Sequence, residues 1–157
     1  MFLKNYWYVA AWDHELGREP LARTLLNEAV VMYRREDGTP VAFADRCCHR
    51  QAPLSLGRVV GDDIQCGYHG MTFDSQGECI AIPGQTTLPP ETRLKVYPVA
   101  ERWQWIWIWM GDPELADEAD IPNIYWHDHP DWAVVGDYLH MKCDYQLLVD
   151  NLLDLTH

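Results

Sequence analysis

The sequence has few basic residues for its length. It contains 12 lysines and arginines against 24 aspartates and glutamates, which gives a formal net charge of −12. Because phosphate binding requires a basic face, this balance argues against nucleic acid and anionic membranes as partners. An excess of carboxylates is compatible with docking to a basic patch on a redox protein, although a solvated acidic surface is the commoner reason for it.

Segments that would direct the chain into a membrane are also missing. No run approaches the ~18 consecutive apolar residues of a membrane-spanning helix. The opening residues, Met1 to Tyr6, lack the basic region and the apolar stretch of a secretory leader. We therefore expect a soluble, cytoplasmic protein with no membrane partner.

Cysteine is scarce, and its number is odd: there are five. An odd set without a leader indicates reduced thiols rather than a disulfide framework. Apolar residues make up 48% of the chain and include eight tryptophans, which is enough to fill a core. Low-complexity disorder is therefore not expected.

Two short motifs combine cysteine with histidine. The first is C-x-H, from Cys47 to His49, and the second is C-x-x-H, from Cys66 to His69. Structural zinc sites usually pair Cys with Cys and His with His. Here each motif supplies one thiolate and one imidazole. That arrangement favours a Rieske [2Fe–2S] cluster, in which two sulfurs hold one iron and two imidazoles hold the other. A zinc site, which uses the same residue types, is the alternative.

The residues around these motifs resemble a known family. The runs CCHRQAPLSLG (47–57) and CGYHGMTF (66–73) look like the Rieske motif of ring-hydroxylating and O-demethylating oxygenases. The opening run NYWYVAAW (5–12) and the closing run NLLDLTH (151–157) resemble the oxygenase subunits of vanillate O-demethylase and their dicamba monooxygenase relatives. The resemblance spans the whole chain, and we interpret it as the N-terminal part of such a subunit.

One departure from the family pattern is Cys48, where the family usually has proline. Its thiol raises the question of whether Cys47 or Cys48 is the cluster ligand. The C-x-H spacing favours Cys47, because adjacent side chains in an extended loop point to opposite sides.

Respiratory Rieske proteins differ from this sequence around the cluster. They clamp the two loops with a disulfide at positions that are here Ala52 and Tyr68. They also place hydroxyl donors at positions that are here Met71 and Phe73. Hydrogen bonds to the sulfurs stabilise the added electron and raise the potential. Their loss predicts a low-potential centre, as oxygenases and Rieske ferredoxins use.

The resemblance implies a second metal site at the end of the chain. His157 corresponds to the first of two histidines on a mononuclear non-haem Fe(II), which is typically held by two His and one carboxylate. Asp154 matches the carboxylate that, in the family, links this iron to a Rieske histidine of a neighbouring subunit. Asn151 matches a position near the iron. The apolar spacing of residues 147–157 predicts a helix that places the three on one face. The other iron ligands would lie beyond this chain.

Strand-like runs and turn residues predict a mainly β fold of antiparallel sheets. The expected strands are residues 6–12, 21–26, 29–35, 41–45, 71–73, 79–82, 94–100 and 103–110. An irregular loop is expected at 83–93, which has three prolines, and one or two strands at 132–146. The acidic, proline-bounded segment 111–122 indicates a boundary. We expect a Rieske domain at 1–115, and at 116–157 a linker and the truncated start of an α+β catalytic domain.

By resemblance, the chain is expected to belong to the oxygenase component of a Rieske non-haem iron monooxygenase. Electrons from NAD(P)H would arrive through a flavin and iron–sulfur reductase or a ferredoxin. With O₂, the enzyme would hydroxylate a methoxy carbon of a small aromatic acid, and the methyl would leave as formaldehyde. A homotrimer is implied, and the fragment alone would be inactive. The rival functions are a stand-alone Rieske-type ferredoxin and a zinc-stabilised binding module.

Overall fold

The structure is a computed structural model that describes residues 2–156, and its strands form three antiparallel sheets. The strands are β1 (Trp7–Trp12), β2 (Leu21–Leu25), β3 (Glu28–Arg34), β4 (Pro40–Ala44), β5 (Arg58–Val60), β6 (Asp63–Gln65), β7 (Thr72–Phe73), β8 (Cys79–Ala81), β9 (Val96–Tyr97), β10 (Val99–Arg102) and β11 (Trp105–Trp109). The helical elements are η1 (Asp13–Glu15), η2 (Leu54–Leu56), η3 (Pro113–Leu115), η4 (Glu118–Asp120), η5 (Tyr125–His127) and α1 (Tyr145–Leu153). The predicted mainly β, antiparallel fold is confirmed.

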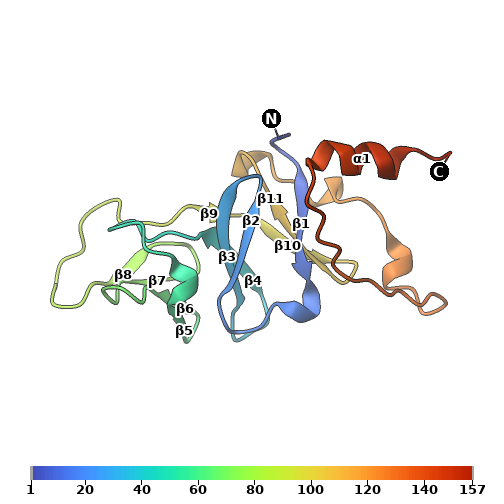
Figure 1. The fold of residues 1–157 in the computed structure, drawn as a ribbon. Coiled ribbons are helices and arrows are strands. Elements are labelled where there is room, and N and C mark those ends of the chain that lie inside the picture. Colours follow the sequence, from blue (N-terminus) through green and yellow to red (C-terminus); the bar gives the residue numbers. More distant parts are fainter. Residues whose placement is uncertain (1, 157) are drawn as a thin grey trace.

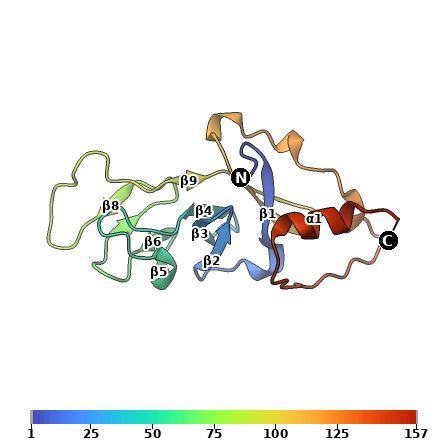
Figure 2. The same ribbon diagram turned by 45° about the horizontal axis from the view of Figure 1, so that its top comes forward.

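The sheets follow one another across the molecule (Figure 1). Sheet A has the order β1-β11-β10, sheet B β2-β3-β4-β9 and sheet C β5-β6-β7-β8. Sheet B is the meander that the sequence predicts. Its β3–β4 turn contains Gly38, whose φ of 87° lies in the left-handed region. Sheet C lies at one end of the molecule, and α1 lies at the other (Figures 1 and 2).

Strand β3 is buried on both faces, and this joins the two main cores. Val31 and Tyr33 belong to the core shared with sheet C, whereas Val30 and Met32 belong to the core shared with sheet A. All four are 0% exposed. Because successive strand residues point to opposite faces, one apolar run can serve two cores. Sheet B is therefore the middle layer, and it fixes where sheet C and its loops sit.

Sheet A carries the tryptophans of β11, and the segment that follows this strand covers part of them. Trp107 is buried against Ile121, with Trp105 and Trp103 packed nearby. Strand β11 begins at Trp105, because Trp103 has a positive φ and belongs to the preceding turn. The acidic segment 111–122 is exposed along most of its length but is attached to the sheet, since the Trp7 indole donates to the Asp117 carbonyl at 2.7 Å.

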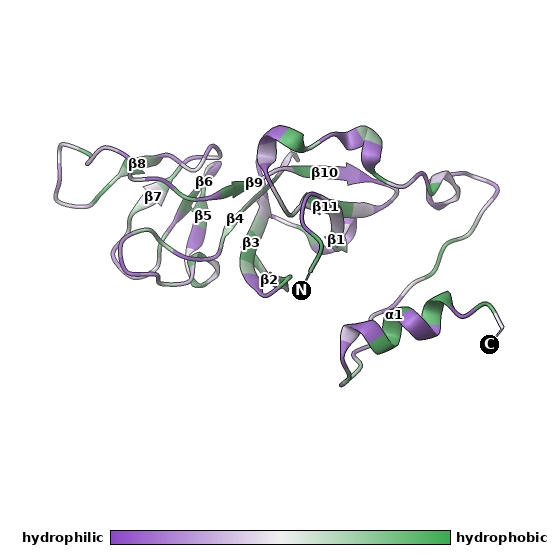
Figure 3. Ribbon diagram, turned by 90° about the horizontal axis from the view of Figure 1, so that it is seen from above, coloured by the Kyte–Doolittle hydropathy of each residue, from purple (hydrophilic) through white to green (hydrophobic). Residues whose placement is uncertain are grey.

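The C-terminal tail, residues 132–156, differs from the prediction in two ways. The expected strands at 132–146 are wrong: residues 133–142 are irregular and pair with no sheet. The expected helix forms as α1, with the Asp144 side chain accepting from Gln146 N at its start. It ends at Leu153, so the prediction that Asp154 lies within the helix is also wrong. Figure 3 shows α1 standing apart from the sheets. Across residues 2–156, no helix combines the length and apolarity needed to cross a bilayer.

Candidate metal centre

The first motif lies on a tight turn, loop 1 (residues 47–52), that follows β4. The Cys47 amide donates to the Ala52 carbonyl at 2.8 Å, and the Gln51 amide donates to the Cys47 carbonyl at 2.9 Å. Gln51 has a φ of 59°, a conformation that non-glycine residues rarely adopt. These bonds close the turn and fix the direction of the Cys47 side chain.

The second motif lies on loop 2 (residues 66–71), which repeats this pattern between β6 and β7. The Cys66 amide donates to the Met71 carbonyl at 2.8 Å, and the Gly70 amide donates to the Cys66 carbonyl at 3.0 Å. Gly70, with a φ of 72°, occupies the place of the left-handed residue in loop 1. The chain after loop 1 comes very close to β6: a Cβ on Gly57 would lie 2.1 Å from the Gln65 carbonyl oxygen. Glycine therefore allows the two loops to approach each other.

The two motif thiols are buried together in the core between sheets B and C. Cys47 and Cys66 are each 2% exposed and belong to the same apolar cluster. Burial, opposed in part by a hydrogen bond from the His49 amide and reinforced by the neighbouring Cys66, raises the pKa of the Cys47 thiol to about 11. As a free thiol Cys47 resists ionisation, so it becomes stable as a thiolate only against positive charge.

The two motif imidazoles lie at the surface. His49 and His69 are exposed, and their ring centroids are 4.8 Å apart at an interplanar angle of 59°. The Tyr68 ring lies 3.9 Å from the His69 ring. Each loop thus places its sulfur inward and its imidazole outward.

This separation tests which metal group the residues fit. Within residues 2–156, no three His, Cys, Asp or Glu side chains come together closely enough to hold one metal ion. A structural zinc ion needs four such ligands at one point. A [2Fe–2S] rhomb needs only two protein ligands at each iron, sulfurs at one and imidazoles at the other. The buried sulfur pair and the exposed imidazole pair fit the two ends of the rhomb.

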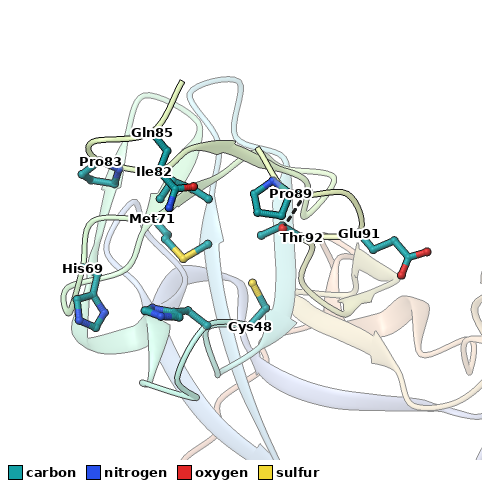
Figure 4. A pocket seen from close by; sticks show the side chains of 10 residues that line it. Cys48, His69, Met71, Ile82, Pro83, Gln85, Pro89, Glu91 and Thr92 are labelled. Carbon is teal, nitrogen blue, oxygen red and sulfur yellow. Dashed lines mark hydrogen bonds between the residues drawn. The ribbon is translucent and has the colours of Figure 1, made fainter. Parts of the chain in front are cut away.

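The neighbouring Cys48 differs from Cys47 in its exposure. It lies at the surface, and its sulfur is on the Thr92 side of the hollow drawn in Figure 4. Burial of its inner side raises the pKa of the Cys48 thiol. Burial therefore groups Cys47, not Cys48, with Cys66 in the apolar cluster, and the choice of Cys47 as the cluster ligand stays a prediction.

Cys48 and the two imidazoles line a hollow of ≈ 530 Å³, the histidine pocket (Figure 4). Its opposite wall comes from the irregular loop 83–93 and includes Pro83 and Pro89. The sequence predicts this loop as irregular but gives no sign that it lies over the cluster loops. The three prolines of this loop indicate only that it is stiff, because proline restricts the backbone of a connection that has no hydrogen-bonded strands.

No side-chain hydroxyl is directed at the two buried sulfurs within the described residues. Met71 is 5% exposed and Phe73 is 0% exposed, and neither has a hydroxyl. The nearby hydroxyls have other acceptors: Ser55 donates to the Asp45 carboxylate at 2.6 Å, and Thr72 donates to the Gly70 carbonyl at 3.3 Å. The prediction of a low-potential centre therefore still depends on the identities of residues 71 and 73.

The predicted second site is not assembled near the first. Asn151 lies in the exposed helix α1, and Asp154 follows it, with its carboxylate accepting from the Thr156 amide at 3.0 Å and from the Thr156 hydroxyl at 2.6 Å. His157 lies outside the described residues. Helix α1 and sheet C with its cluster loops lie at opposite ends of the molecule (Figures 1 and 2). Asp154 could therefore approach His49 or His69 only in another copy of the chain.

Comparisons with known proteins agree with this geometry. The profile of the Rieske [2Fe-2S] domain matches residues 6–98. The chain is 53% identical to the iron–sulfur subunit of the toluene-4-sulfonate monooxygenase system of Comamonas testosteroni over 158 residues, which cover 100% of this chain and 46% of that protein. It is 47% identical to a vanillate O-demethylase oxygenase subunit of a Pseudomonas strain, covering 100% of this chain and 45% of that protein.

Solved structures give the same result. The crystal structure of dicamba monooxygenase bound to dicamba superimposes with a TM-score of 0.94 at 46% identity, and the match covers 99% of this chain and 47% of that one. The chain thus spans less than half the length of the relatives it matches. Paired cysteine–histidine loops, a buried sulfur pair, surface imidazoles and a profile match over more than half the residues lead to one conclusion: the chain belongs to the Rieske [2Fe–2S] domain family.

Proposed function

We propose that this chain is the electron-transfer part of the oxygenase component of a Rieske monooxygenase of the O-demethylase kind. In this proposal Cys47 and Cys66 hold the inner iron, and His49 and His69 hold the outer iron. The observation that carries the proposal is the division of the ligands into a buried sulfur pair and an exposed imidazole pair. When bound, the cluster supplies one-electron redox chemistry.

The protein contributes burial at one side of the site and access at the other. The core around Leu54, Ile64 and Phe73, all 0% exposed, keeps water from the thiolates. The imidazole rings remain at the surface, where electrons can enter and leave. Methionine and phenylalanine replace sulfur donors at residues 71 and 73, so we expect a potential toward the lower end of the Rieske range, near −150 mV.

In the longer protein, electrons would come from an NAD(P)H-dependent flavin and iron–sulfur reductase or from a ferredoxin. They would support oxidation of a small aromatic acid by O₂ at a mononuclear Fe(II), with His157 among its ligands and Asp154 and Asn151 beside it. The support for this step is the family of the relatives, which are named as monooxygenases and O-demethylases. A homotrimer would bring Asp154 of one subunit to His49 or His69 of the next.

The test begins with residues 1–157 purified without oxygen and supplied with iron and sulfide. We expect about two irons and two labile sulfides per chain and a Rieske-type EPR signal after reduction. A colourless protein that binds one zinc ion and no sulfide would contradict the proposal. Extending the chain to the length of its relatives should then give formaldehyde release from a methoxylated aromatic acid. A stand-alone carrier would take up electrons without consuming O₂ or releasing formaldehyde.

A further inference from the structure

The lysines and arginines of this chain differ in whether they have carboxylate partners. Most of those in the described residues form ion pairs, such as Arg34 with Glu101 and Lys95 with Glu28. The cations for which residues 2–156 provide no ion-pair partner are Arg46, Arg50, Arg58, Arg102 and Lys142.

Three of these unpaired arginines surround the cluster loops. Arg46 immediately precedes Cys47, Arg50 immediately follows His49, and both are exposed. Arg58 lines a hollow beside loop 2 together with Cys66, and it contacts only the Gln65 amide side chain, at 2.6 and 2.9 Å. Unpaired positive charge is thus concentrated around the loops that carry the imidazoles.

Two further cations lie beside Arg46, each with a carboxylate partner: Arg93 pairs with Glu78 at 3.1 Å and Lys95 pairs with Glu28 at 2.7 Å. Arg46, Arg93 and Lys95 line one hollow of ≈ 310 Å³, which also contacts Cys48 and Gln51 and has no carboxylate in its lining. The carboxylate that lines the adjoining histidine pocket, Glu91, points away from it (Figure 4). We call Arg46, Arg50, Arg58, Arg93 and Lys95 the basic face.

The sign of this face is opposite to that of the chain. The whole chain carries −12, with 24 acidic side chains to 12 basic ones. A cationic patch on such a protein attracts a compact acidic partner to the loops. An extended polyanion would also contact the acidic remainder of the surface and be repelled by it. Charges of this kind orient a partner during encounter and raise the association rate.

We propose that the basic face docks the acidic surface of a small electron-transfer protein and brings its redox centre to the exposed imidazoles. This proposal rests on the proposed function, because it supplies the electron donor to the same site. It also reverses the expectation from net charge alone, in which the chain would present acidic groups to a basic partner. The partner's carboxylates would supply the counter-charges that Arg46 and Arg50 lack.

The experiment measures binding of a reduced plant-type [2Fe–2S] ferredoxin of strong negative charge to residues 1–157 with the cluster in place. One variant carries Arg46→Glu and Arg50→Glu. The control carries Arg102→Glu and Lys142→Glu, which changes net charge equally at unpaired cations away from the loops. Titrations at low and high salt give the Kd, and stopped-flow absorbance gives the rate of electron transfer. Dithionite, a small reductant, serves as a reference donor.

We expect the first variant to weaken binding at low salt about tenfold or more, and the control to change it less than about threefold. Wild-type binding should weaken about tenfold as salt rises beyond roughly 0.1 M. Reduction by dithionite should be equal in all three proteins. Equal ferredoxin binding by all three, or binding insensitive to salt, would overturn the docking proposal.

Other results separate this proposal from its rivals. If the charge reversal abolishes self-association in sedimentation and leaves ferredoxin binding intact, the basic face contacts a second copy, and the proposal is wrong. If the wild type lacks the Rieske spectrum, the proposed function fails, while the Kd still reports independently on docking.

Discussion

Sheet C, which carries loop 2, buries several of its apolar residues, whereas the C-terminal tail leaves most of its apolar residues exposed. Strands β5 to β8 are only two or three residues long, yet Ile64 and Phe73 are 0% exposed. The tail contains a regular helix, yet none of the residues of α1 is buried, and Val135 and Leu155 are each 95% exposed. Local regularity and tertiary burial are therefore separate properties, and stability comes chiefly from burial.

The difference follows from what lies next to each region. Sheet C faces the two-sided strand β3 and shares its core. The tail contacts the body at a few points, among them the Tyr138 hydroxyl at Glu15 and the Phe2 ring 5.2 Å from the Tyr145 ring. Relatives are about twice as long. We infer that their second half supplies the cover that the tail lacks here.

The largest expected effect concerns the thiols. Cys47→Ser should abolish cluster assembly, because a buried hydroxyl is a poor ligand for iron, whereas Cys48→Ser should keep the full iron and sulfide content. Both changes replace one sulfur by oxygen, so they are matched. Metal analysis with acid-labile sulfide decides between them. Loss of the cluster in the Cys48 variant with retention in the Cys47 variant would reverse the ligand assignment.

The comparison of burial predicts the next effect. Phe73→Ala should lower the free energy of unfolding by about 3–5 kcal/mol, because it removes a fully buried ring from the core behind the loops. Leu152→Ala, at a position 69% exposed, should change it by less than about 0.5 kcal/mol. Urea denaturation of the two variants measures both. A similar loss in both would mean that the helix is covered in solution.

Ion pairs within the body provide a pH-dependent effect. Hydrogen bonds from Lys4, at 2.5 Å, and Lys95, at 2.7 Å, together with one from the Tyr97 hydroxyl, lower the pKa of Glu28 to about 2. The unfolded value is about 4.3, so the stabilisation is complete above about pH 5 and is lost as the pH falls toward 2. After allowance for partial exposure it amounts to about 1–2 kcal/mol.

The measurement is a comparison of Glu28→Gln with the wild type at neutral pH and at about pH 3. The stability difference should be full at neutral pH and should shrink in acid, because the carboxylate of the unfolded chain, with the higher pKa, then becomes protonated first. Glu19→Gln, at an exposed glutamate with no ion pair in the described chain, is the matched control and should show little effect at either pH. A difference that grows in acid would contradict the assigned pKa.

The same two regions explain how much the sequence could predict. The β3–β4 hairpin was predictable because the short apolar runs of both strands and the turn at Gly38 are local signals. The ligand motifs were predictable because their spacing limits the metal groups that can bind. The burial of one ligand type and exposure of the other depend on how sheet C packs against sheet B, and no local pattern contains that information.

The failures occurred where a local pattern needed a partner. Residues 132–146 alternate like a strand, but a strand forms only beside another, and residues 133–142 pair with none of the described sheets. The helix ended before Asp154, whose side chain bonds to Thr156. The wall of the histidine pocket at 83–93 depends on contacts between segments far apart in the sequence.

The smallest expected effect tests how the tail is held. Tyr138 donates its hydroxyl to Glu15, which also binds Arg23 at 3.0 Å, and burial together with this bond raises the pKa of Tyr138. Tyr138→Phe keeps the ring and removes the bond, so global stability should fall by less than about 0.5–1 kcal/mol. Amide exchange in residues 132–144 should nevertheless become faster, while exchange in β3 stays unchanged, because local opening of the tail does not require unfolding of the sheets. Tyr125→Phe, at an exposed tyrosine whose hydroxyl has no partner in the described chain, should leave both rates unchanged. Faster exchange in β3 of the Tyr138 variant would mean that the tail and the sheets unfold as one unit, and the contrast between the two regions would not hold.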